Sequence, residues 1–131
     1  MTVQGSLGTY LGADAGVVGL IDTGAIWPVR APDGTTGNYI VYRFQDRRDL
    51  NPIDGPATLA QCVLEIESFS GNYDRAWQIA EALRTALTFF QGVMASGVDV
   101  RGCLLDNMRD DDAPEFGVFN VVSEYRIDFV I

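Results

Sequence analysis

Apolar side chains recur at every third or fourth position in two stretches of the chain, and this spacing predicts two helices. The first helix, residues 2–14, has four such side chains on one face: Val3, Leu7, Tyr10 and Leu11. The second helix, residues 73–90, has a longer stripe: Tyr73, Ala76, Trp77, Ala80, Leu83, Leu87 and Phe90. Because each stripe faces one way, we expect each helix to pack one side against a core.

The ends and interiors of these helices carry further signals. Asn72 is a good N-cap for the second helix, and Gly92 is placed to end it. The first helix contains Gly5, Gly8 and Gly12, and each interior glycine costs a helix about 1 kcal/mol relative to alanine. These glycines either let a neighbouring backbone approach closely or leave the helix loose.

Alternation of apolar and polar side chains predicts four strands. They span residues 39–45, 59–69, 98–105 and 116–131. The last is much longer than the usual strand of about five or six residues. We therefore expect it to project beyond the sheet or to pair with different partners at its two ends.

Two of the strands carry more detailed signals. In residues 59–69 we expect two alternating sets of side chains. Those of Cys62, Leu64 and Ile66 should be buried, and those of Gln61, Glu65 and Glu67 should face solvent. Gly102 interrupts the third strand, and an isolated glycine inside a strand indicates a bulge.

The connecting segments are rich in turn residues. Residues 22–38 contain Pro-Asp-Gly, a turn signal, and Ile26-Trp27-Pro28, which we expect to anchor the segment against the core. Residues 46–58 contain two prolines and mixed charges, and we expect an extended loop between two strands.

The elements together predict one α+β domain over residues 1–131. Their order is helix-strand-strand-helix-strand-strand. Consecutive strands pair most often as hairpins, so we expect an antiparallel sheet of about four strands with the helices packed on one face. A chain of 131 residues is long enough to bury roughly two-thirds of its unfolded surface.

Composition adds a strong acidic excess. The net charge is −9, from 18 acidic and 9 basic residues, and all nine basic residues are arginine. This balance argues against nucleic-acid binding through phosphate contacts, although DNA could pass such a surface without sticking to it. The first basic residue is Arg30 and the apolar stretches are short, so we expect no signal peptide and no membrane span. Cys62 and Cys103 are expected to be buried free thiols of a soluble protein from a reducing cytoplasm.

The residues that most enzymes rely on are missing. The chain has no histidine and no lysine, which removes the commonest general base and metal ligand, Schiff-base chemistry and the P-loop lysine. No cofactor motif is present. A carboxylate-only mechanism remains open, as in glycoside hydrolysis, and Glu65 with Glu67 is one candidate pair. Because both are expected on the solvent face of a strand, we predict no catalytic residue.

The acidic run at residues 106–117 is the other candidate site. It fails as a calcium-binding EF-hand loop, because Met108 occupies the third position and no glycine stands at the sixth. Two interpretations remain: loose binding of Ca²⁺ or Mg²⁺ at Asp110, Asp111 and Asp112, or the solvated tip of a hairpin. The strands predicted on either side favour the hairpin tip, and we predict no metal site.

The order of hydrophobic blocks resembles the tail completion or tail terminator proteins of long-tailed bacteriophages, in the gp17-like group. The matching blocks are "LGADAGV", "IWP" followed by "AP", "YIVYRF", "CVLEIESF", "YDRAWQIAEALRTAL", "DVRGCLLDNMRD" and "FGVFNVVSEYRIDFVI". They run nearly from end to end of the chain. One departure is Asn38, where the family pattern has proline.

The resemblance implies a structural virion protein with no catalysis and no cofactor. It implies a homo-oligomer, a six-membered ring at the end of the tail tube, which stops tube polymerisation and joins the tail to the head-side connector or stopper protein. DNA would pass through the lumen without sequence-specific binding. Arg47, Arg48 and Asp49 are candidate contacts with another subunit, and Asp110, Asp111 and Asp112 would repel DNA or pair with arginines of an adjacent ring.

Three other functions stay open at this point. The chain could be a different ring protein of the neck, such as a stopper or a minor tail protein. It could be a small hydrolase that works through carboxylates alone, or a monomeric cytosolic binding domain.

Overall fold

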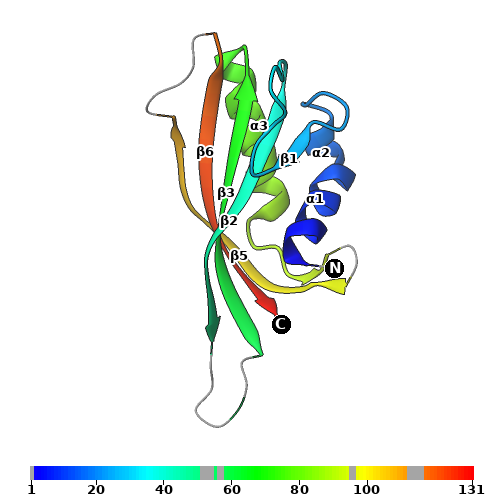
Figure 1. The fold of residues 1–131 in the computed structure, drawn as a ribbon, viewed down its shortest axis with the longest axis vertical. Coiled ribbons are helices and arrows are strands. Elements are labelled where there is room, and N and C mark those ends of the chain that lie inside the picture. The colour runs from blue at the N-terminus through cyan, green and yellow to red at the C-terminus, as the bar shows by residue number, and fades with distance from the viewer. Residues whose placement is uncertain (1, 51–54, 56–57, 95–96, 112–116) are drawn as a thin grey trace.

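The fold is given by a computed structural model, which describes residues 2–50, 55, 58–94, 97–111 and 117–131 (Figure 1). Its helices are α1 (Val3–Ala13), α2 (Ala15–Val18) and α3 (Tyr73–Leu87). Its strands are β1 (Ile26–Pro28), β2 (Tyr39–Leu50), β3 (Leu59–Ser70), β4 (Gly92–Val93), β5 (Asp99–Asp110) and β6 (Phe119–Val130). Within these residues no helix is long and apolar enough to cross a membrane.

The six strands form one curled, mixed sheet in the order β1-β2-β3-β6-β5-β4. The two predicted antiparallel hairpins, β2–β3 and β5–β6, are confirmed, and β3 and β6 join them in the middle of the sheet. The α+β class is therefore confirmed, whereas the sheet is mixed and has six strands in place of the predicted antiparallel sheet of about four. Ile26–Pro28, expected to be only an anchor, pairs in parallel with Ile40–Tyr42, and Gly92–Val93 adds a short sixth strand.

The hairpin strands are longer than the sequence pattern indicates. Residues 46–50, expected to belong to a loop, continue β2, and the last three of them pair with the start of β3. The strand pairing shifts register between Gln45 and Arg48, which forms a bulge. Asp46 adopts a left-handed backbone with φ 51° at this bulge. Figure 1 shows the resulting β2–β3 arm extending beyond the helices. The remainder of the predicted loop, apart from Gly55 and Thr58, lies outside the described residues.

Strand β5 also runs beyond its predicted end, from Asp99 to Asp110. Its register shifts once between Val100 and Gly102, as the glycine predicted, and again between Leu105 and Asn107. Each extra residue bends the strand and increases the local twist, so these bulges contribute to the curl of the sheet.

Helix α3 begins as predicted and ends earlier. The Asn72 side chain accepts a hydrogen bond from the backbone N–H of Arg75 at 3.0 Å, which caps the first turn. The helix does not reach Gly92. Thr88 is extended, Phe89 has a φ of 63°, and the Phe89 N–H donates to the carbonyl of Cys103 at 2.7 Å. This bond to β5 turns the chain out of the helix.

The helices cover one face of the sheet and bury the main hydrophobic core between the two layers (Figure 1). Leu7 and Leu11 of α1, Leu83 of α3 and Tyr125 of β6 are all fully buried there. Gly8 supports this packing, because a Cβ at this position would lie 2.8 Å from the Tyr42 hydroxyl. Of the two alternatives for these glycines, a close approach does occur at Gly8, but it is made by a side chain and not by a neighbouring backbone.

Candidate functional site

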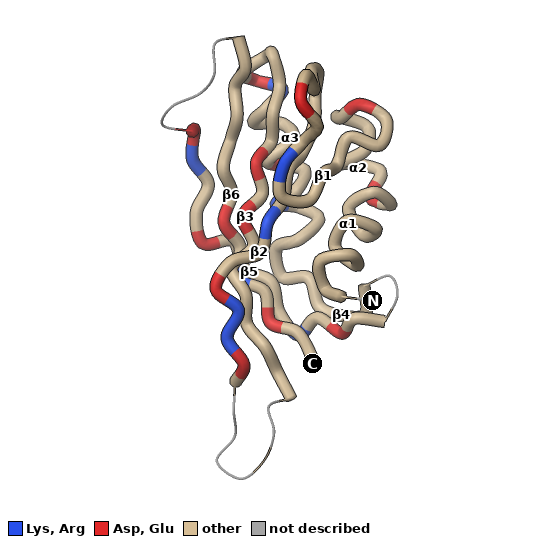
Figure 2. Tube along the Cα trace, in the orientation of Figure 1, with Lys and Arg blue, Asp and Glu red and all other residues tan. Residues whose placement is uncertain are grey.

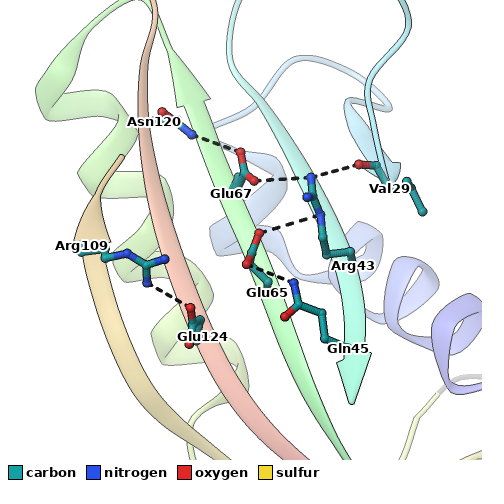
Figure 3. Close-up of polar contacts among 8 residues, drawn as sticks. All are labelled: Val29, Arg43, Gln45, Glu65, Glu67, Arg109, Asn120 and Glu124. Atoms are coloured by element: carbon teal, nitrogen blue, oxygen red, sulfur yellow. Dashed lines mark hydrogen bonds and ion pairs between the residues drawn. The ribbon is translucent and has the colours of Figure 1, made fainter. Parts of the chain in front are cut away.

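The side of the sheet away from the helices carries a cross-strand array of charged and polar side chains. In β3 the buried Cys62, Leu64 and Ile66 alternate with half-buried Glu65 and Glu67, so the two glutamates face away from the helices. We call this side the open face and define it by Arg43, Gln45, Glu65, Glu67, Arg109, Asn120 and Glu124, together with their neighbours in register. Figure 3 shows these side chains on four adjacent strands.

Arg43 is the centre of this array. Its guanidinium lies 3.4 Å from the carboxylate of Glu67 and 3.8 Å from that of Glu65, and it also donates to the Val29 carbonyl at 3.2 Å. The Gln45 amide donates to Glu65 at 3.2 Å. The glutamate side chains are only 15% and 18% exposed, whereas Arg43 is 40% exposed. One arginine thus balances two largely covered carboxylates.

Burial raises the pKa of Glu67 above its ordinary value, Arg43 opposes this rise, and the charge of Glu65 adds to it. The Asn120 amide donates to Glu67 at 3.1 Å and favours its charged form. A raised carboxyl pKa is typical of catalytic acids, but ion-pair networks between strands produce it as well. Because both glutamates are bonded to side chains of neighbouring strands, the arrangement favours a structural network.

A cleft of about 420 Å³ lies over one end of the open face, between the segment 29–35 and the sheet. Its sheet side includes Tyr39 and Phe69, whose rings stack at 4.6 Å, and it extends to Arg43 and Glu67. The cleft therefore offers an aromatic wall that ends in charged groups, a surface suited to contact with another polypeptide.

The second hairpin holds the acidic residues that the sequence singled out. Arg109 pairs with Glu124 at 3.1 Å. Asp110 accepts hydrogen bonds from Tyr73 at 3.0 Å and from Trp77 at 2.8 Å, and so it binds α3. Asp111 borders the cleft, and its N–H donates to the carbonyl of Asn120 at 3.1 Å. Asp112 lies outside the described residues, and the predicted roles of all three in assembly stay predictions.

The other predicted contacts lie on the β2–β3 arm. Arg47 pairs with Asp49 at 3.0 Å and stands 5.5 Å from the centre of the Phe129 ring. Arg48 is opposite Gln61 in register and lines a second groove, of about 480 Å³. The structure therefore brings Arg47, Arg48 and Asp49 together on one arm, in a chain segment separate from Asp110 and Asp111. Their contact with another subunit remains a prediction.

No group of three cysteine or acidic side chains in the described part of the chain is placed to hold a metal ion. The sequence reasoning missed Arg43, Asn120 and Trp77. A cross-strand signal was available for Arg43, because pairing of the predicted hairpin places it directly opposite Glu65 and diagonally from Glu67. The contact of Trp77 with Asp110 joins a helix to a distant strand and has no such local signal.

Three comparisons place the chain among known proteins. Residues 6–128 match the model of a family described as tail completion protein gp17. A search of curated protein sequences finds no significant match. Among solved structures, a chain of the "Virion of native gene transfer agent (GTA) particle" superposes with a TM-score of 0.80 at 19% sequence identity. The superposition covers 98% of this chain and 95% of the other, which shows a shared fold.

Proposed function

The chain belongs to the tail completion protein gp17 family, and from that premise we propose that it closes the end of a phage tail tube as a ring of identical subunits. It is a structural protein of the virion tail. The observation that carries the proposal is the family match, which spans nearly the whole chain from residue 6 to residue 128.

In the proposed role six copies form the ring. The ring stops polymerisation of the tail tube protein on one side and receives the connector or stopper protein of the head on the other. DNA passes through the lumen without sequence-specific contacts. The acidic excess of the chain supports this last point, because a net charge of −9 per subunit disfavours tight binding of phosphates.

The free edges of the sheet support lateral association. β1 pairs with β2 only at Ile40–Tyr42, and β4 pairs with β5 only at Asp99–Val100. Along the described residues, the outer sides of β2 beyond Arg43 and of β5 beyond Gly102 therefore have no strand partner. Such edges readily pair with other chains, and two different edges suit a head-to-tail ring.

The polar array favours a structural over a catalytic role. Glu65 and Glu67 share Arg43 and bond to Gln45 and Asn120, all from the same sheet. A network of this kind holds β2, β3 and β6 in register and gives the open face a fixed shape for a partner.

Native mass spectrometry of the chain alone and after mixing with tail tubes tests the proposal. A ring appears as six copies of the 14.3 kDa chain, about 86 kDa. Electron microscopy should then show the ring at one end of each tube, and tubes polymerised in its presence should stop growing. A chain that binds head connectors but never tube ends would be a stopper, and a chain that forms no ring and leaves tube growth unchanged would overturn the proposal.

A further inference from the structure

Two arginines, Arg48 on β2 and Arg126 on β6, form no ion pair with any carboxylate that the structure describes. Six of the nine arginines form ion pairs with carboxylates among the described residues. Within the same residues Arg48, Arg75 and Arg126 form none. Arg48 and Arg126 both line the groove of about 480 Å³, whereas Arg75 lies on α3.

The strand register places these two arginines on the same side of the sheet. Arg48 is opposite Gln61, and Arg126 is opposite Val63. Gln61 and Val63 are two residues apart on β3 and so face the same way. The two guanidinium groups therefore flank β3 from its two neighbouring strands, on an extension of the open face toward the arm, and Figure 2 shows how the charges follow the strands.

The groove is cationic even though acidic groups are near. Asp46 also lines it but forms no ion pair with either arginine, and Arg47 is already paired with Asp49. Three arginines and one carboxylate, Asp46, line this groove, so its local charge is positive although the net charge of the chain is −9. Arginine is well suited to bind a carboxylate at an interface, because its planar fork donates two parallel hydrogen bonds.

An exposed acid lies on β5, the strand that pairs with the one carrying Arg126. Asp106 is exposed in the second bulge of β5, and it makes no hydrogen bond or ion pair with any residue that the structure describes. β5 and β2 lie on opposite sides of the central pair β3 and β6. A contact between the groove of one copy and Asp106 of the next joins two different surfaces and is therefore heterologous, and such contacts form a closed ring where the rotation between copies closes.

We propose that the groove between Arg48 and Arg126 binds a carboxylate of a second copy of this chain, and that Asp106 supplies it. The proposal rests on the ring proposed above. Copies with a charge of −9 repel one another, but repulsion between exposed charges is screened beyond about 8 Å at physiological salt. Ion pairs at short range then decide how two copies align at the interface. A cationic groove that faces an acidic bulge provides this charge complementarity.

Charge reversal tests the pairing. In R48E/R126E the groove becomes acidic, and the protein concentration needed for half-assembly should rise at least about tenfold, because like charges across an interface repel strongly. D106R alone should weaken assembly in the same way. The triple variant R48E/R126E/D106R restores opposite charges and should regain most of the assembly. Native mass spectrometry with and without tail tubes reads out each variant.

The control is R75E/R84E on α3, which changes the net charge by the same amount away from the groove. If it weakens assembly as much as R48E/R126E does, total charge is the cause and the proposal fails. Wild-type assembly by R48E/R126E, or no recovery in the triple variant, also overturns it. If R48E/R126E assembles normally but loses retention of a short duplex DNA, the groove binds phosphate and the proposal is wrong.

The two proposals fail in different ways. If the wild-type protein forms a ring that never binds tube ends and R48E/R126E is monomeric, the tail-closing function is contradicted and the proposed interface is supported. If the wild-type protein closes tubes and R48E/R126E closes them equally well, the proposed interface is contradicted and the function is supported. A wild-type chain that forms no oligomer, alone or with tubes, overturns both.

Discussion

The indole Nε1 of Trp77 donates a hydrogen bond to Oδ1 of Asp110 across 2.8 Å and thereby ties the first turns of α3 to the end of β5. The other carboxylate oxygen of Asp110 accepts from the Tyr73 hydroxyl at 3.0 Å, and the Tyr73 ring meets Phe119 edge to face. Asp110 thus fastens the helix layer to the outer hairpin.

Asp110→Ala should lower the free energy of unfolding by about 1 kcal/mol, because the half-buried Trp77 N–H loses a charged acceptor. Urea denaturation measures the change. Asp33→Asn is the control, since it breaks an ion pair that is almost fully exposed. A double-mutant cycle with Trp77→Phe should show coupling between the two positions. Equal stability of Asp110→Ala and wild type would show that the contact contributes nothing in solution.

The glycines of α1 should respond in opposite directions to the same substitution. Gly12→Ala should stabilise the protein by about 0.5–1 kcal/mol, because it removes the helix cost of glycine and its new Cβ meets nothing within 4 Å. Gly8→Ala should be neutral or destabilising, because its Cβ would force the buried Tyr42 hydroxyl from its place and strain the bond to the Gln4 carbonyl. Thermal unfolding compares the two. If both variants were more stable than wild type, the Tyr42 side chain would be able to move away from the new Cβ without loss of stability.

Much of this fold follows from local patterns. The period of the apolar positions located α3, β3 and β6, Asn72 marked the start of α3, and Gly102 marked a bulge, because these signals act within a few residues. The continuation of β2 through Arg47 and Arg48 could not be found in this way. Arg48 and the two residues after it pair because β3 lies alongside them, and a partner strand overrides weak local preference.

The residues of the candidate surfaces also divide into those that local patterns locate and those that depend on tertiary structure. Glu65 and Glu67 were correctly placed on the solvent side of their strand by alternation. Their partner Arg43 depends on hairpin register, and the link from Asp110 to α3 depends on the three-dimensional fold. Asp110 was expected to stand free at a hairpin tip, whereas the strand runs up to it and the helix binds it.

Alkaline pH should destabilise the protein through Cys103. Burial raises the pKa of this thiol from 9.0 to about 12, and the charge of Asp128 adds to the rise. Between these values the unfolded chain loses a proton that the folded chain keeps, so stability is complete below pH 9 and falls as the pH rises toward 12. A single such group contributes a slope of about 1.4 kcal/mol per pH unit.

Chemical denaturation at several pH values measures this slope. Cys103→Ala should reduce it without abolishing it, because burial also raises the pKa of Tyr125. The comparison uses slopes, so the cavity made by the substitution does not affect it. In the folded protein Cys103 should resist alkylation at pH 8 and react only after unfolding. Fast alkylation under native conditions, or equal slopes in the two proteins, would contradict the prediction.

Removal of Arg43 should destabilise the protein in a pH-dependent way. Arg43→Met leaves the largely covered Glu65 and Glu67 without their shared cation, and at pH 7 we expect a loss of about 1 kcal/mol after solvent screening is allowed for. The pKa of Glu67 is already raised by burial, and without Arg43 it rises further. The folded variant then takes up a proton more readily than the unfolded chain, so its deficit relative to wild type should shrink as the pH falls toward 4.5.

The matched control is Arg30→Met, which removes an exposed arginine and should change stability little at any pH. Adding Glu67→Gln to Arg43→Met should recover part of the loss at pH 7, because the amide is neutral and still accepts the hydrogen bond from Asn120. Urea denaturation at pH 7 and pH 4.5 reads out all four proteins. A deficit that is constant with pH would show that Arg43 acts through packing of its stem, and that the carboxylate pair needs no cation.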